Sequence, residues 1–175
     1  MLSKDTLVTT VMTNLGLVNA AKEKGIQIVQ TKVGDRYVLE EMLEKGYTLG
    51  GEQSGHIICL DFNTTGDGLC SALLLLSILK KTGKRLSELS SVFVPLPQVM
   101  VNAKVSNAKK ETYRDDDVIM EAIREVEEEF SGNGRVLIRP SGTEPCVRVM
   151  IEGPEQGIIT QKANYLAKLI EARLI

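Results

Sequence analysis

The chain has 175 residues, with 21 Lys and Arg against 23 Asp and Glu, for a formal net charge of −2. This length allows one large domain or two small ones, each with a core of its own. The charge balance, the absence of Trp and the presence of only three Phe argue against a nucleic-acid surface with stacking aromatics. The run Leu73–Leu76 is far too short to cross a bilayer. We therefore expect no nucleic-acid partner and no membrane span.

The cysteine and histidine content argues against a disulfide framework or a zinc site. Cys59, Cys70 and Cys146 are odd in number, far apart, and flanked by apolar residues, and His56 is the one histidine. Buried free thiols in a reducing compartment are the favoured interpretation. The N-terminal residues do not resemble a signal peptide. We expect a cytoplasmic protein with no metal ligands in this chain.

In the first half of the chain, β-branched runs alternate with helical spacing. The expected strands are Thr6–Thr13, Ile26–Thr31, Thr48–Gly50 and His56–Phe62, and the expected helices are Leu17–Lys24, Arg36–Lys45 and Asp67–Thr82. Each helix is followed by a glycine, a common C-terminal signal. This alternation predicts an α/β layered domain over residues 1–91. The segment Leu69–Leu79 is apolar nearly all round, which predicts a helix buried against the sheet.

Two prolines, Pro95 and Pro97, interrupt regular structure, so residues 92–98 are expected to be a linker. In residues 99–175 we expect three strands, Val99–Val105, Arg135–Arg139 and Val147–Glu152. One helix, Asp116–Phe130, is expected after the first strand, and another, Glu155–Leu174, at the end. This order predicts a small α+β domain, an antiparallel sheet with two helices on one face. The acidic run Asp115–Asp117 precedes an amphipathic helix, so helix capping explains it better than metal binding.

The segment Arg139–Pro145 has the composition of an anion-binding loop. Arg139 offers a fixed cation, Ser141 and Thr143 offer hydroxyls, and Gly142 lets backbone N–H groups approach an anion. It is not a Walker loop, because no Gly-Lys-Ser/Thr ending is present and a strand follows. Arg148 on that strand adds a second positive charge. The alternative is a plain hairpin turn in which Arg139 pairs with an acid.

The segment Gly50–His56 places polar side chains at alternate positions. In an extended segment, Glu52, Ser54 and His56 would point to one side, as they would in a loop that lines a pocket. Such a set of an acid, a hydroxyl and an imidazole suits the recognition of sugar hydroxyls. The alternative is a solvated turn in which His56 bonds to a backbone carbonyl.

These two loops resemble the sugar-recognition loop and the phosphate-binding loop of the α-D-phosphohexomutase family. The segments Thr10–Gly16, Lys32–Val38 and Thr65–Gly68 are similar to further family stretches in the same order. Gln53 is similar to the branch that acts on glucosamine phosphates, whereas relatives acting on mannose or glucose phosphates commonly carry Met there. The family has four domains, and this chain resembles the last two, with the fourth expected to be TATA-binding-protein-like.

The resemblance implies interconversion of glucosamine 6-phosphate and glucosamine 1-phosphate, a step toward amino-sugar nucleotides and the cell wall. It assigns sugar binding to Glu52, Gln53, Ser54, His56, Asp35 and Arg36, and phosphate binding to Arg139, Ser141, Gly142, Thr143 and Arg148. Apart from possible assistance by His56, the resemblance places no catalytic residue here, because the phosphoserine loop and the Mg²⁺ loop belong to upstream domains.

The resemblance further implies a glucosamine or glucose 1,6-bisphosphate activator. The chain alone is expected to be an inactive monomer, and the oligomeric state of the full-length protein stays open. Two alternatives remain: a phosphomannomutase/phosphoglucomutase fragment, or a non-catalytic phosphosugar-binding module.

Overall fold

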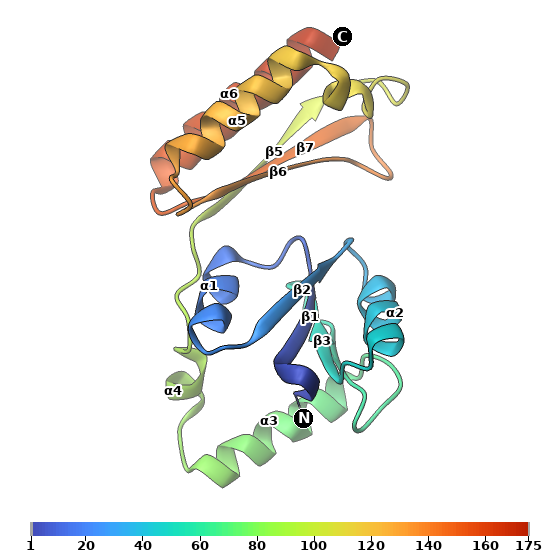
Figure 1. Cartoon of the computed structure of the whole chain (residues 1–175), viewed down its shortest axis with the longest axis vertical. Helices are drawn as coiled ribbons and strands as arrows, with labels where there is room; N and C mark the ends of the chain where they lie inside the picture. Colours follow the sequence, from blue (N-terminus) through green and yellow to red (C-terminus); the bar gives the residue numbers. More distant parts are fainter. Residues whose placement is uncertain (1, 175) are drawn as a thin grey trace. The chain divides into compact units, whose positions relative to one another are not determined.

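The computed structural model describes residues 2–174 and divides the chain into two compact units, Met1–Pro95 and Leu96–Ile175 (Figure 1). The first unit is a mixed α/β layer and the second is an antiparallel sheet with helices on one face. The fold class predicted from the sequence is confirmed.

The described part of the first unit contains a four-stranded sheet in the order β2-β1-β3-β4. Its elements in chain order are η1 (Ser3–Asp5), β1 (Thr6–Thr10), α1 (Leu15–Glu23), β2 (Gln27–Thr31), α2 (Asp35–Lys45), β3 (Leu49–Gly51), β4 (Ile57–Cys59), α3 (Gly68–Thr82) and α4 (Leu86–Ser90). Strand β1 runs parallel to both β2 and β3, while β4 returns antiparallel to β3. The carboxyl ends of β1, β2 and β3 therefore meet at one edge of the sheet, where ligand sites of open α/β sheets commonly lie.

Two predicted strands are shorter than their β-branched composition suggested. The strand expected to reach Thr13 ends at Thr10, because the backbone turns and the Thr13 N–H donates to the Thr10 carbonyl at 2.9 Å. The Asn14 side chain then caps α1 by accepting from the Gly16 N–H at 2.9 Å. A similar turn after Cys59, whose carbonyl accepts from the Phe62 N–H at 3.0 Å, ends β4.

Helix α2 covers one face of this sheet at close range. Val38 and Met42 on α2 are fully buried against Val8 and Ile58 of the strands. A Cβ at Gly50 of β3 would lie 2.5 Å from the Met42 sulfur and 2.7 Å from a Val38 methyl, so only glycine allows this approach. Gly50, the glycine at the start of the β3–β4 turn, thus has a packing role.

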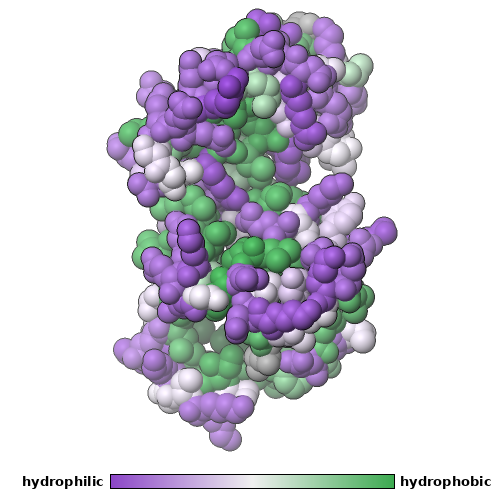
Figure 2. Space-filling model, viewed as in Figure 1, coloured by the Kyte–Doolittle hydropathy of each residue, from purple (hydrophilic) through white to green (hydrophobic). Residues whose placement is uncertain are grey.

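The prediction that α3 is buried against the sheet is wrong. None of its residues is buried, and the exposed apolar side chains on this helix are Leu69, Leu73, Leu75, Leu76 and Ile78. The main sheet contact of α3 is with β4, a three-residue edge strand, so most of the helix has no strand to cover. In Figure 2, hydrophobic side chains reach the surface in the region that α3 occupies. Apolar composition predicted the helix but not its burial.

The described part of the second unit contains a three-stranded antiparallel sheet in the order β5-β7-β6. Its elements are β5 (Gln98–Lys104), η2 (Thr112–Asp115), α5 (Asp117–Glu129), β6 (Arg135–Pro140), β7 (Cys146–Glu152) and α6 (Gln156–Leu174). Figure 1 shows α5 and α6 side by side over one face of the sheet.

Alternation along the central strand β7 separates the two faces of this sheet. Val147, Val149 and Ile151 are fully buried in the core with helix residues such as Ile159 and Leu166. Because side chains alternate across a strand, Arg148 points to the face without helices. Figure 2 shows that the outer surface of the two helices is largely hydrophilic. Over residues 2–174, no helix combines the length and apolar character needed to cross a membrane.

Candidate functional site

The first candidate loop is the turn between β3 and β4, at the carboxyl edge of the parallel strands. The Glu52 N–H donates to the His56 carbonyl at 2.9 Å, and the Gly55 N–H donates to the Glu52 carbonyl at 3.0 Å. Gly55 has a φ of 105°, a backbone conformation that favours glycine. The turn therefore holds residues 52–56 in a fixed shape.

Within this turn, the side chains of Glu52, Ser54 and His56 lie together. The Ser54 hydroxyl is 3.1 Å from His56 Nδ1 and 3.4 Å from Glu52 Oε2, and Glu52 Oε2 is 3.6 Å from His56 Nδ1. The Glu52 side chain is only 9% exposed, whereas that of His56 is 56% exposed. The three groups thus form a connected polar cluster whose imidazole is open to solvent.

A backbone contact joins this cluster to the loop before α2. The Gly34 N–H donates to Glu52 Oε1 at 2.8 Å. The neighbouring charges are directed to α2 itself: Asp35 Oδ1 accepts from the Arg36 N–H at 2.9 Å, and Arg36 Nε pairs with Glu40 at 2.7 Å. The Arg36 side chain is 81% exposed. Asp35 and Arg36 lie next to the cluster in sequence, but their charged groups are engaged on the helix.

A cavity of about 500 Å³ lies beside the turn. Its lining is largely apolar, with Glu52, Gln53 and His56 among the polar groups. The other lining residues are Leu7, Thr9, Thr13, Asn14, Leu17, Leu49, Gly50, Gly51, Ile57, Phe93 and Pro95. A concave apolar surface with a few polar groups is typical of small-molecule sites.

The second candidate loop joins β6 to β7. The Ser141 N–H donates to the Cys146 carbonyl at 2.9 Å, and the Glu144 N–H donates to the Ser141 hydroxyl at 3.1 Å. Ser141 is 1% exposed. Its hydroxyl therefore holds the loop closed from inside.

Other donors of this loop have no partner within residues 2–174. They are the backbone N–H groups of Gly142 and Thr143 and the Thr143 hydroxyl, none of which makes a hydrogen bond to another described residue. A Cβ built at Gly142 would meet nothing within 4 Å, so the loop is open at this point. Neighbouring free N–H groups beside open space are the features of a backbone anion nest.

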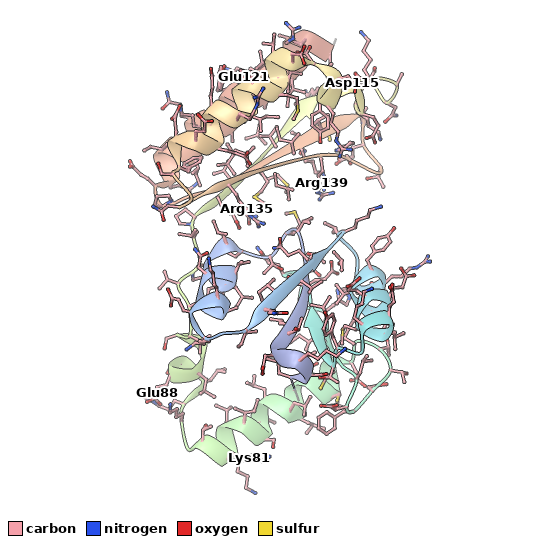
Figure 3. All side chains as sticks on the ribbon, in the orientation of Figure 1. Lys81, Glu88, Asp115, Glu121, Arg135 and Arg139 are labelled. Carbon is pink, nitrogen blue, oxygen red and sulfur yellow. The ribbon has the colours of Figure 1, made fainter. Side chains whose placement is uncertain are left out.

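Two arginines stand directly opposite each other where the strands enter this loop. Arg139 and Arg148 are paired in the β6–β7 register, and Arg148 Nη2 donates to Glu144 Oε2 at 2.7 Å. The Arg139 side chain makes no hydrogen bond or ion pair to any residue of the described chain. Burial, and then the charge of Arg148, lower the pKa of Arg139 from its usual value. Figure 3 shows Arg135 and Arg139 on the sheet face turned away from α5 and α6.

The segment between β5 and α5 makes hydrogen bonds to this loop and to the strand before it. The local sequence gave no reason to expect these contacts. Lys110 Nζ donates to the Ser141 carbonyl at 2.5 Å. The Tyr113 hydroxyl donates to the carbonyl of Ile138 on β6 at 2.9 Å and accepts from Arg114 Nε at 3.0 Å. Lys110 lies 31 residues before Ser141 in the sequence, so only the fold shows the contact.

No group of three or more His, Cys, Asp or Glu that could hold a metal ion occurs in the described part of the chain. Asp115–Asp117 acts as predicted, with Asp116 capping α5 by accepting from the Val118 and Ile119 N–H groups. The described residues therefore do not supply a ligand set for Mg²⁺.

Comparison with known families matches both units. Residues 1–95 match the α/β/α domain III of the phosphoglucomutase/phosphomannomutase family, and residues 100–169 match its C-terminal domain. The chain belongs to this family. The resemblance drawn from the two loops is thereby confirmed.

Curated relatives of this phosphohexomutase chain include two phosphoglucosamine mutases. That of Ruminiclostridium cellulolyticum is 64% identical and that of Alkaliphilus metalliredigens 61% identical, each over 173 residues and 99% of this chain. The alignments cover 38% and 39% of those proteins. The chain thus spans about two fifths of the length of the relatives it matches.

Solved structures of the phosphohexomutase superfamily share the fold. An Aspergillus fumigatus N-acetylphosphoglucosamine mutase gives a TM-score of 0.80 at 18% identity, covering 97% of this chain and 38% of that one. A variant of that enzyme with one serine replaced by alanine, in complex with glucose 1,6-bisphosphate, gives a TM-score of 0.78 at 17% identity, with the same coverage of both chains. The complex of the A. fumigatus enzyme with N-acetylglucosamine 6-phosphate and magnesium gives 0.77 at 18% identity, covering 94% of this chain and 41% of that one.

Proposed function

We propose that this chain is the phosphosugar-binding part of a phosphoglucosamine mutase that interconverts glucosamine 6-phosphate and glucosamine 1-phosphate. The observation that carries the proposal is the opposed pair Arg139 and Arg148, of which Arg139 has no carboxylate partner in the described chain. Like charges directly opposite on paired strands are destabilising unless an anion lies between them. The curated relatives support the choice of a glucosamine phosphate.

In this proposal the β6–β7 loop holds the phosphate that does not react. Arg139 supplies a bidentate guanidinium, and Gly142 and Thr143 supply N–H and hydroxyl donors to the phosphate oxygens. Ser141 shapes the loop from inside, and Arg148 contributes charge while paired with Glu144. Binding energy gained at this remote end orients the reacting end of the substrate. A site that recognises only the oxyanion accepts a phosphate from either position of the sugar.

In this proposal the β3–β4 turn binds the sugar ring. Glu52 and Ser54 bond to ring hydroxyls, and Gln53 provides an amide for the amino-sugar branch. His56, whose imidazole is open to solvent, contacts the bridging oxygen or assists a proton transfer. Asp35 and Arg36 act at longer range, since their charges are engaged on α2.

Phosphoryl transfer itself is assigned to the part of the protein outside this chain. Mg²⁺ and the phosphoserine would be held there, with a glucosamine or glucose 1,6-bisphosphate as activator, so this chain alone does not turn over. We place the protein in the cytoplasm, with this chain as a monomer. The A. fumigatus complexes with glucose 1,6-bisphosphate and with N-acetylglucosamine 6-phosphate and magnesium support the choice of a bisphosphate activator and of Mg²⁺.

A calorimetric titration with glucosamine 6-phosphate tests the proposal. Arg139→Met should weaken binding about ten- to hundredfold, the scale of a lost charged hydrogen bond of about 1.5–3 kcal/mol. Arg124→Met is the matched control, because Arg124 is an exposed α5 arginine paired with Glu121. Unchanged affinity in Arg139→Met would remove Arg139 from the site. Comparison with mannose 6-phosphate and glucose 6-phosphate tests the choice of substrate.

A further inference from the structure

We propose that Lys110 is a positioning residue of the phosphate loop, holding the Ser141–Gly142 peptide so that the Gly142 N–H faces the anion. This inference rests on the proposed function. It assigns a role to a residue outside both recognition loops.

The Ser141 carbonyl is the point at which Lys110 acts. The other polar groups of Ser141 are already fixed, since its N–H donates to Cys146 and its hydroxyl accepts from Glu144. Lys110 Nζ donates to the remaining carbonyl oxygen at 2.5 Å. Lys110 is itself held in place, because its N–H donates to the Ser106 carbonyl at 3.0 Å.

Peptide geometry carries the effect of this contact to the anion site. In a trans peptide the C=O and the next N–H point in opposite directions, and the described chain contains no cis peptide bond. A cation on the Ser141 oxygen therefore directs the Gly142 N–H to the other side of the loop. Gly142 has open space around it and no side chain to fix the peptide plane, so sterics alone would let the peptide rotate.

Lys110 also carries a charge that no described carboxylate neutralises. Its Nζ makes no ion pair within residues 2–174, and the Ser141 carbonyl uses one of its three donors. Lys110 thus adds a positive charge near the loop entered by Arg139 and Arg148. A role in charge alone and a role in positioning make different predictions.

Titration of the full chain with inorganic phosphate, with ¹⁵N NMR of the free protein, separates these roles. Lys110→Met should weaken phosphate binding about tenfold and move the Gly142 and Thr143 amide resonances before any phosphate is added. Lys110→Gln, which keeps a donor without the charge, should leave those resonances near their native positions, and Lys110→Arg should restore most of the affinity. Lys168→Met on α6 is the control for net charge and should bind as the wild type does.

The outcomes are distinguishable from failure of the proposed function. Native affinity in Lys110→Met, together with lost binding in Arg139→Met, would overturn the role of Lys110 and leave the site intact. Weaker binding in Lys110→Met with unmoved Gly142 and Thr143 resonances would mean that Lys110 contributes only its charge, and would overturn its positioning role. Native affinity in Arg139→Met would overturn the phosphate site itself. If Lys110→Met does not fold, Lys110→Gln and Lys110→Arg carry the same comparison.

Discussion

Arg139 is a half-buried cation that the described chain leaves without a counter-charge. Its neighbour across the strands is another arginine, and the Glu144 carboxylate pairs with that neighbour instead. Such an arrangement lowers the stability of the ligand-free protein and is compensated when an anion binds. Strain of this kind is typical of binding sites.

Arg139→Met should therefore stabilise the ligand-free chain while weakening phosphate binding. Removing a like charge directly across a strand pair is worth about 0.2–1 kcal/mol, which raises the melting temperature by about 1–8 °C in a unit of this size. Differential scanning calorimetry without phosphate measures this. A lower melting temperature would mean that Arg139 has a structural partner and is not held ready for a ligand.

The sequence located both loops but not which of their groups are free. Ser141 and Thr143 look alike as hydroxyl donors in Arg139–Pro145, yet the Ser141 hydroxyl accepts a backbone bond inside the loop while that of Thr143 stays open. The difference depends on how the hairpin folds over itself. The contact from Lys110 depends on a segment 31 residues away and has no local signal at all.

At the scale of elements, Asp116 joins two helices of the second unit. It caps α5, and its Oδ2 accepts from Arg173 Nε on α6 at 2.6 Å. The hydrogen bond from Arg173 and the backbone N–H groups of Ile119 and Val118 lower the pKa of Asp116. A carboxyl group whose pKa is lower in the folded than in the unfolded state stabilises the fold at pH values above its unfolded-state pKa. This contribution is lost as the pH falls through the folded-state pKa.

Asp116→Asn should accordingly flatten the acid dependence of stability. Above about pH 4, the unfolded pKa of Asp, the variant should be less stable than the wild type, because it keeps the cap but loses the ion pair. The difference should disappear as the pH falls through the folded pKa. Urea unfolding at pH 7 and pH 3 measures this, with the exposed Asp117→Asn as control. An equal loss at both pH values would show that the carboxylate charge of Asp116 does not cause the difference in stability.

Helix ends were easier to predict than strand ends, for physical reasons. Gly25, Gly46 and Gly83 follow α1, α2 and α3 with positive φ, which L side chains rarely adopt, so glycine itself indicates the end. Strand ends have no such residue. The run from Thr6 to Thr13 is suited to a strand throughout, and a backbone turn that composition does not encode ends it at Thr10.

At the scale of the whole molecule, α3 shows that an apolar segment need not belong to the core: the helix is rich in leucine, but none of its residues is buried. Periodicity cannot decide whether an apolar helix is buried, because burial depends on how much sheet lies beneath it. The core of the first unit instead contains Val8, Val38, Met42 and Ile58, and the largest core lies in the second unit.

Substitutions on α3 test this assignment. The double change Leu73→Gln and Leu76→Gln should alter the free energy of unfolding by no more than about 0.5 kcal/mol per site, because both side chains are exposed. Met42→Ala should cost about 2–5 kcal/mol, because Met42 is fully buried. Urea denaturation provides both values. A loss of several kcal/mol in the double variant would place α3 in the core after all.

Binding of a sugar phosphate by the β6–β7 hairpin can be observed in a crystal of this chain soaked in glucosamine 6-phosphate. We expect phosphate density within hydrogen-bonding distance of the Arg139 guanidinium and of the Gly142 and Thr143 N–H groups. An empty hairpin, with Arg139 bonded to a carboxylate of the chain, would show that the hairpin is not the phosphate site.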